Sequence, residues 1–166
     1  FDQEARYWLA LCKWRDLKPQ PAINDLKNLI EEVDSEEFMS RIYLSLGEIY
    51  LSIDNSEDAY NNFNKGANLS KNRLLREQVY FQIAEISFEN SDFDNALESY
   101  QKVLSNTVSI TRIQDSNLKI VQIYRLRGEL EKSANRIQEL IIDEDFSSIK
   151  SDLDLELTKI EFDRGK

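Results

Sequence analysis

Histidine is absent from this 166-residue sequence, and cysteine, proline and glycine are scarce, with one Cys, two Pro and four Gly. Without histidine and with a single thiol, the chain has no Ser-His-Asp or Cys-His catalytic set, no multi-cysteine zinc site and no internal disulfide. Four scattered glycines do not form a phosphate-binding loop or a dinucleotide-binding turn. We therefore expect no cofactor, no metal and no catalytic site among these residues.

The charge is one-sided, with 31 Asp and Glu against 21 Lys and Arg and a formal net charge of −10. Nucleic-acid binding depends on a basic surface, so this balance argues against a nucleic-acid partner. No apolar run approaches the roughly 18 residues that a membrane-spanning helix needs. Hydrophobic residues still make up 41% of the chain, which is enough for a continuous core.

The sequence does contain a repeat of 37 residues. Gly47 and Ala84 are separated by this interval, and so are Ala59 and Ala96. Further columns with the same interval are Leu9, Leu46, Ile83, Ile120 and Leu157; Cys12, Ile49, Ile86, Ile123 and Ile160; and Phe63, Tyr100 and Ile137. Several columns in register without a gap indicate a repeat protein.

Each period has the spacing of two helices. Tyr43, Leu46, Gly47 and Tyr50 fall at i, i+3, i+4 and i+7, which is one face of a helix. After a polar break, a second helical group follows from Ala59. No strand pattern is present. We predict helices over 3–16, 22–33, 37–53, 56–70, 74–91, 93–106, 111–127, 130–142 and 147–163.

The breaks between these helices carry capping chemistry. The segments 54–56 (Asp-Asn-Ser) and 90–92 (Asn-Ser-Asp) are turn residues whose side chains can cap the following helix. Thr111 and Gln114 have the spacing of a capping box. Pro19 is expected in a turn, with Pro21 at the first position of the next helix.

These residues resemble the tetratricopeptide repeat (TPR) family, whose repeats carry an aromatic, Leu-Gly and Tyr on the first helix and Ala, an aromatic and a small residue on the second. The clearest unit holds Tyr43, Leu46, Gly47, Tyr50, Ala59, Phe63 and Gly66, and the next holds Tyr80, Ile83, Ala84, Ala96 and Tyr100. The resemblance implies an all-α superhelix of helix-turn-helix repeats. A HEAT-like array is the alternative.

By this resemblance the whole chain, 1–166, is one TPR array. Its repeats are expected at about 3–36, 37–73, 74–110 and 111–146, followed by a capping helix at 147–163. Because the last helix would begin a fifth repeat, we interpret the chain as a fragment of a longer protein. Residues 5–10 (Ala-Arg-Tyr-Trp-Leu-Ala) are similar to repeats of bacterial cell-envelope TPR proteins, which favours the periplasmic side of the envelope over the cytoplasm.

In the TPR family the first helices line a concave groove that takes a peptide. The resemblance assigns the following positions to that groove: Tyr7, Leu11, Trp14, Arg41, Leu44, Glu48, Leu51, Gln78, Phe81, Glu85, Phe88, Leu118, Gln122 and Arg125. The alternative is that these are ordinary packing residues between repeats. The lysines and asparagines with which chaperone-binding TPR domains hold a carboxylate are missing here, so an acidic C-terminal peptide is an unfavourable ligand.

Two acidic clusters and the single cysteine each allow a specific functional interpretation and a structural one. Glu48 and Glu85 occupy the same position in consecutive repeats, which allows a pair of catalytic carboxylates or, as we expect, a solvated acidic strip. Asp152, Asp154 and Glu156 lack the glycine and glutamate of a calcium loop, so we predict a solvated helix face. Cys12 heads an isoleucine column, so we predict a buried thiol.

The sequence thus predicts a non-catalytic scaffold that binds a protein or peptide segment in its groove. The alternative is a regulatory or dimerising arm of a multidomain enzyme whose catalytic domain lies outside this chain. Self-association through the first helix, near Trp8, is a further expectation.

Overall fold

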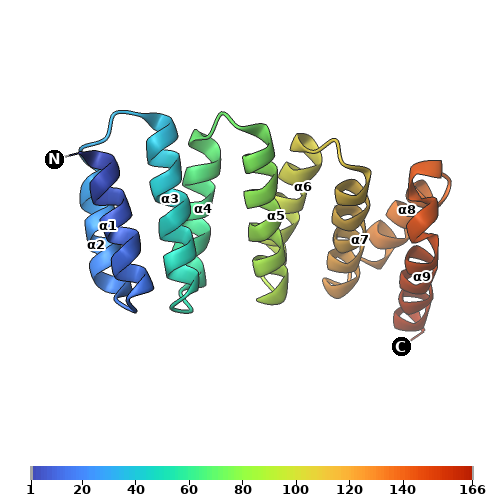
Figure 1. The fold of residues 1–166 in the computed structure, drawn as a ribbon. Helices are drawn as coiled ribbons and strands as arrows, with labels where there is room; N and C mark the ends of the chain where they lie inside the picture. The colour runs from blue at the N-terminus through green and yellow to red at the C-terminus, as the bar shows by residue number, and fades with distance from the viewer. Residues whose placement is uncertain (1, 166) are drawn as a thin grey trace. The chain divides into compact units, whose positions relative to one another are not determined.

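The computed structural model describes residues 2–165, and within that range it contains helices and turns and no strand. The helices are α1 (Gln3–Arg15), α2 (Pro19–Ile30), α3 (Glu36–Leu51), α4 (Ser56–Leu69), α5 (Arg73–Glu89), α6 (Phe93–Asn106), α7 (Ile110–Leu126), α8 (Leu130–Ile141), the 3₁₀ helix η1 (Glu144–Ile149) and α9 (Lys150–Arg164) (Figure 1). The predicted all-α repeat fold is confirmed. None of these helices combines the length and apolar character that a bilayer span needs.

The chain divides into two compact units, Phe1–Ile83 and Ala84–Lys166, with the boundary inside α5. In the first unit, α1 pairs with α2 and α3 pairs with α4. Gly47 explains how closely α3 and α4 approach, because a Cβ built there would lie 2.6 Å from the Phe63 ring. A large side chain of α4 therefore packs directly on the small residue of α3.

In the second unit, α7 contacts α6, α8 and α9. A core cluster of buried side chains joins α7, α8, η1 and α9, made of Val121, Ala134, Ile137, Leu140, Phe146, Leu153 and Ile160. Ile160, at the end of the isoleucine column, is fully buried here. The last helix therefore belongs to the core of this unit, as its predicted capping role requires.

Several helix starts differ from the prediction. α2 begins at Pro19 rather than at residue 22, because the first four backbone N–H groups of a helix have no partner inside it and both Pro19 and Pro21 fit there. α7 begins at Ile110, and its cap is Ser109, whose side chain accepts from Arg112 N. The capping box proposed at Thr111 is therefore wrong. The last predicted helix is a 3₁₀ turn followed by α9.

Other caps are as the sequence predicts. Asn55 accepts a hydrogen bond from Asp58 N at the start of α4. Asp92 does the same for Asn95 N at the start of α6. Each turn before these caps contains one residue with a positive φ, Asp54 (57°) and Ser91 (60°), so the turn residues shape the break as well as cap the helix.

Candidate functional site

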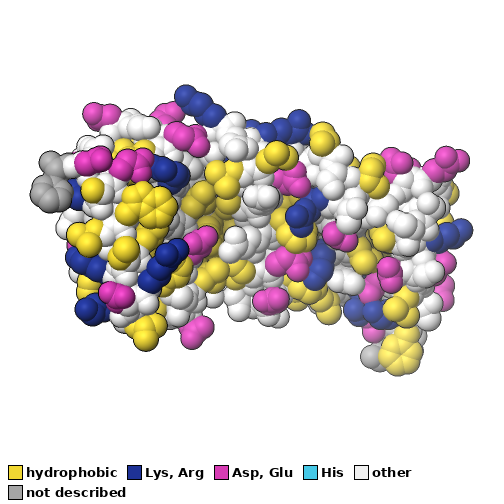
Figure 2. All heavy atoms as spheres, viewed as in Figure 1, with side chains coloured by type: hydrophobic (Ala, Val, Ile, Leu, Met, Phe, Trp, Pro, Cys, Tyr) yellow, Lys and Arg dark blue, Asp and Glu magenta, His cyan; other side chains and the backbone are white. Residues whose placement is uncertain are grey.

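A cleft of about 320 Å³ opens in the first unit between α1 and α3, and we call it the α1–α3 cleft. It is lined by Tyr7, Trp8, Leu11, Trp14, Arg15, Arg41, Leu44, Ser45, Glu48 and Leu75. Six of these were assigned to the groove from sequence, namely Tyr7, Leu11, Trp14, Arg41, Leu44 and Glu48. On the face seen in Figure 2, hydrophobic side chains gather over α1 and α3. The structure thus brings six of the predicted groove residues together in one cleft.

Helical spacing alone places these side chains. Tyr7, Leu11 and Trp14 occupy one face of α1 at i, i+4 and i+7. Their polar ends are bonded to α3 and to the residue that follows it. The Tyr7 hydroxyl lies 2.9 Å from Ser45 Oγ, and Trp14 Nε1 donates to Ser52 Oγ at 3.0 Å. The aromatic walls of the cleft are therefore fixed in orientation, with their hydrogen-bonding groups satisfied.

Arg41 is held by neighbours within the same unit. Its guanidinium pairs with the Glu4 carboxylate. It also lies 5.4 Å from the centroid of the Tyr7 ring and 4.8 Å from that of Phe38, distances at which a cation is attracted by an aromatic face. Its positive charge is thus already partnered inside the protein.

Glu48 differs from Arg41 in having no such partner. Among residues 2–165 no hydrogen bond or ion pair reaches its side chain. The carboxylate is accessible to solvent, yet desolvation by its neighbours raises its pKa above the ordinary value. It also lies in the last turn of α3, where the helix dipole disfavours negative charge. Glu48 is therefore an electrostatically uncompensated group facing a cleft.

The other groove residues predicted in the first unit do not line this cleft. Leu51 and Phe81 are half-buried and Gln78 is exposed. Sequence reasoning in turn missed four lining residues, Trp8, Arg15, Ser45 and Leu75. Leu75 comes from the first turn of α5, outside the positions that the repeat pattern marks.

The groove residues predicted in the second unit are engaged in contacts there. Glu85 accepts a hydrogen bond from the buried Tyr100 hydroxyl and pairs with Lys119 Nζ at 3.5 Å. The same ammonium lies 4.3 Å from the centroid of the Phe88 ring. Leu118 packs against the core cluster of this unit.

Gln122 and Arg125 contact α9. Both donate to Glu156, at 3.2 and 3.1 Å, and Arg125 also donates to Asp163 at 3.2 Å. Glu156 is only 2% exposed, so the prediction of a solvated face is wrong for this residue, although Asp152 is exposed. The prediction failed because α9 packs against α7, which places Glu156 beside Arg125. The Arg125 guanidinium then compensates the buried charge.

Cys12 is exposed, which corrects the prediction of a buried thiol. Of the later residues of its column, Ile49, Ile123 and Ile160 are fully buried and Ile86 is half-buried. In the first unit α3 packs against α2, and within residues 2–165 no helix covers the corresponding face of α1. Trp8 and Leu9 are consequently 55% and 56% exposed.

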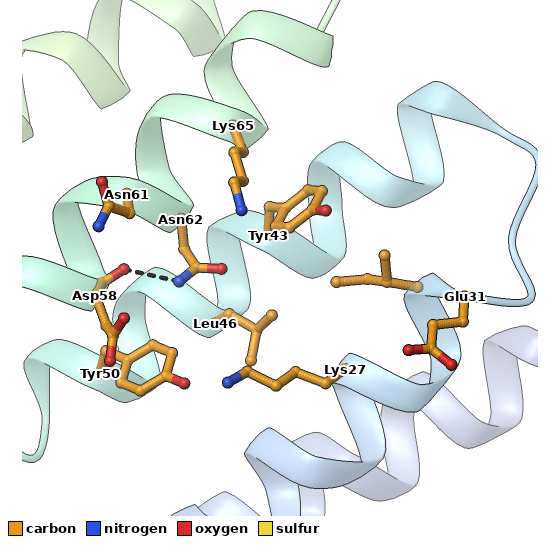
Figure 3. Close-up of a pocket in the computed structure, with 10 residues that line it drawn as sticks. Lys27, Glu31, Tyr43, Leu46, Tyr50, Asp58, Asn61, Asn62 and Lys65 are labelled. Carbon is orange, nitrogen blue, oxygen red and sulfur yellow. Dashed lines mark hydrogen bonds between the residues drawn. The ribbon is translucent and has the colours of Figure 1, made fainter.

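A larger cavity of about 530 Å³ lies among α2, α3 and α4. Figure 3 shows Lys27 from α2 and Lys65 from α4 pointing toward the tyrosines of α3. Hydrogen bonding with Tyr50 raises the pKa of Lys27, and Lys65 lies 5.5 Å from the centroid of the Tyr43 ring. These ammonium groups already have partners in the cavity wall. No group of acidic or cysteine side chains in the described part of the chain is arranged to hold a metal ion.

The paired helices and their common register define an α-helical repeat protein. Residues 40–73 and 77–106 match the model of the tetratricopeptide repeat. Over these two segments, the resemblance of the sequence to the tetratricopeptide repeat family is therefore confirmed.

Solved structures with the same fold include MamA, with a TM-score of 0.65 and 17% identity over 98% of this chain and 82% of that one. The apo form of RapI has a TM-score of 0.63 and 15% identity over 99% of this chain and 65% of that one. PilF of Pseudomonas aeruginosa has a TM-score of 0.54 and 16% identity over 99% of this chain and 67% of that one. At these identities the likeness concerns the fold. No curated protein sequence matches the chain.

Proposed function

We propose that this protein is a non-catalytic scaffold that binds a segment of another protein in the α1–α3 cleft. The observation that carries the proposal is the convergence of Tyr7, Leu11, Trp14 and Leu44 on one cavity whose aromatic walls are fixed. Rigid aromatic anchors in a partly apolar cleft are typical of binding hot spots. Tetratricopeptide repeats commonly serve as protein-binding scaffolds, which supports this class of partner.

The catalytic alternative for Glu48 and Glu85 has less support. Glu85 is engaged by Tyr100 and Lys119, so its carboxylate serves packing within the second unit. The division of the chain into four repeats remains part of the proposal.

A displayed library of random twelve-residue peptides tests the proposal, with selection on the immobilised full chain. Enriched peptides should lose at least roughly tenfold in affinity on Leu11→Ser, because the cleft then loses an apolar wall. Leu17→Ser is the matched control, since Leu17 is 89% exposed and outside the cleft. Unchanged far-UV circular dichroism would establish that both variants fold. Absence of enrichment, or equal affinity for L11S, L17S and the parent, would refute the proposal.

A further inference from the structure

Glu48 and Glu85 are equivalent in register but differ in what surrounds them. They are 37 residues apart, at the same position of consecutive repeats. Glu85 is neutralised inside its own unit by the Lys119 ammonium and the Tyr100 hydroxyl. Glu48 has neither contact, and among residues 2–165 no cation or donor replaces them. In the second unit, the carboxylate at this repeat position is therefore compensated by groups of the protein itself.

The positive groups that face the cleft do not serve Glu48. Arg41 is paired with Glu4 and stacked on two rings. Arg15 lines the cleft but forms no ion pair with Glu48 within 4.0 Å. As a basic residue in the last turn of α1, it is favourably placed toward the dipole of its own helix. The uncompensated charge in the cleft is therefore the negative one.

The walls around this charge suit a long basic side chain. Leu11, Leu44 and Leu75 offer apolar surface to an aliphatic stem, as happens when lysine or arginine stems pack along apolar groups with the charged end free. The Trp14 ring also lines the cleft, and aromatic rings attract cations. The net charge of −10 adds a long-range attraction for a basic partner.

We infer that Glu48 selects a lysine or arginine of the bound protein segment, whose cation pairs with the Glu48 carboxylate while its stem lies on the leucines of the α1–α3 cleft. This inference rests on the proposed function and names the chemistry of its ligand. It also assigns a reason for the electrostatic cost of Glu48, because a residue that is unfavourable in the free protein is compensated when the ligand binds.

Peptides selected on the parent protein, as above, test this inference directly. Each enriched peptide should contain Lys or Arg at a constant distance from its apolar residues. Replacing that residue by norleucine should weaken binding to the parent roughly tenfold, but should have little effect on binding to Glu48→Gln. Glu57→Gln is the matched control, because it removes the same charge from an exposed site outside the cleft.

Two further measurements distinguish selection from a structural role. Glu48→Gln should unfold at the same or a higher urea concentration than the parent. If the carboxylate had a structural role, its removal would instead lower the urea concentration at which the protein unfolds. Because a bound cation lowers the pKa that desolvation raises in the free cleft, affinity for the parent should be full above the free-state pKa and fall as the pH decreases through it. Binding to E48Q should lack this dependence.

The outcomes separate the two proposals. Enriched peptides that need Leu11 but carry no constant basic residue, or that bind E48Q as well as the parent, would overturn the role of Glu48 and leave the cleft as the binding site. Peptides indifferent to L11S would overturn both.

Discussion

Gly47→Ala provides a direct test of how α3 and α4 pack. The added Cβ would lie 2.6, 2.7 and 2.8 Å from three atoms of the Phe63 ring, whereas ordinary contacts begin at 3.4 Å. The ring is 2% exposed, so it cannot swing into solvent and must displace its neighbours. Overpacking of this kind costs about 1–3 kcal/mol, and replacing glycine inside a helix returns about 1 kcal/mol.

We therefore expect G47A to lower the free energy of unfolding by about 1 kcal/mol, with an upper range of about 2 kcal/mol. For a chain of this size, 1 kcal/mol corresponds to about 2–4 °C in Tm. Urea denaturation followed by circular dichroism measures the difference. Gly165→Ala is a control for the substitution itself, because its Cβ would have ordinary contacts at 3.6 and 3.7 Å.

The first repeat suggests a second substitution that should relieve this clash. In the first repeat the same two positions hold Ala10 and Leu26, both fully buried. The double variant G47A/F63L reproduces that combination, so its loss should be smaller than the sum of the single losses by about 1 kcal/mol. A stabilising G47A, or additive effects in the double variant, would refute the packing argument.

Three further predictions concern single residues. Arg125→Met should lower the free energy of unfolding by about 2–3 kcal/mol, because it leaves the buried Glu156 with Lys159 but without its guanidinium; R125M/E156M should recover more than half of that loss in urea titrations. Tyr100→Phe should cost about 1–2 kcal/mol, since the hydroxyl bonds a charged acceptor. Burial and Glu85 raise the pKa of Tyr100, so folding retains a proton that the unfolded phenol loses near pH ~10. Stability should thus fall as the pH rises above that value, more steeply for the parent than for Y100F. Cys12 should react fully with a thiol reagent in the folded protein, because it is exposed; labelling only after urea is added would contradict its position.

Much of the fold follows from local rules that the sequence expresses directly. The interval of 37 residues and the i, i+3, i+4 and i+7 spacing predict the repeats and their helices, because both depend on helical geometry. Part of the lining of the α1–α3 cleft was predictable for the same reason. Tyr7, Leu11 and Trp14 share a face of one helix, and Leu44 and Glu48 share a face of the next.

The position of a residue within its repeat does not determine whether a neighbouring helix covers that residue. For these residues the tertiary structure determined burial. Cys12 and Ile49 have the same register, but α2 packs against α3 while the corresponding face of α1 is open within the described residues. Glu156 resembles an exposed acid in the sequence, yet it is buried because α9 sets it against Arg125. The difference between Glu48 and Glu85 likewise comes from the side chains that face them, since Glu85 contacts Tyr100 of its own repeat and Lys119 of the next. The sequence determined which residues share a helix face, since that depends on backbone geometry alone; the tertiary structure decided which faces are covered and which charges are compensated, because burial and pairing depend on the side chains that the next helix supplies.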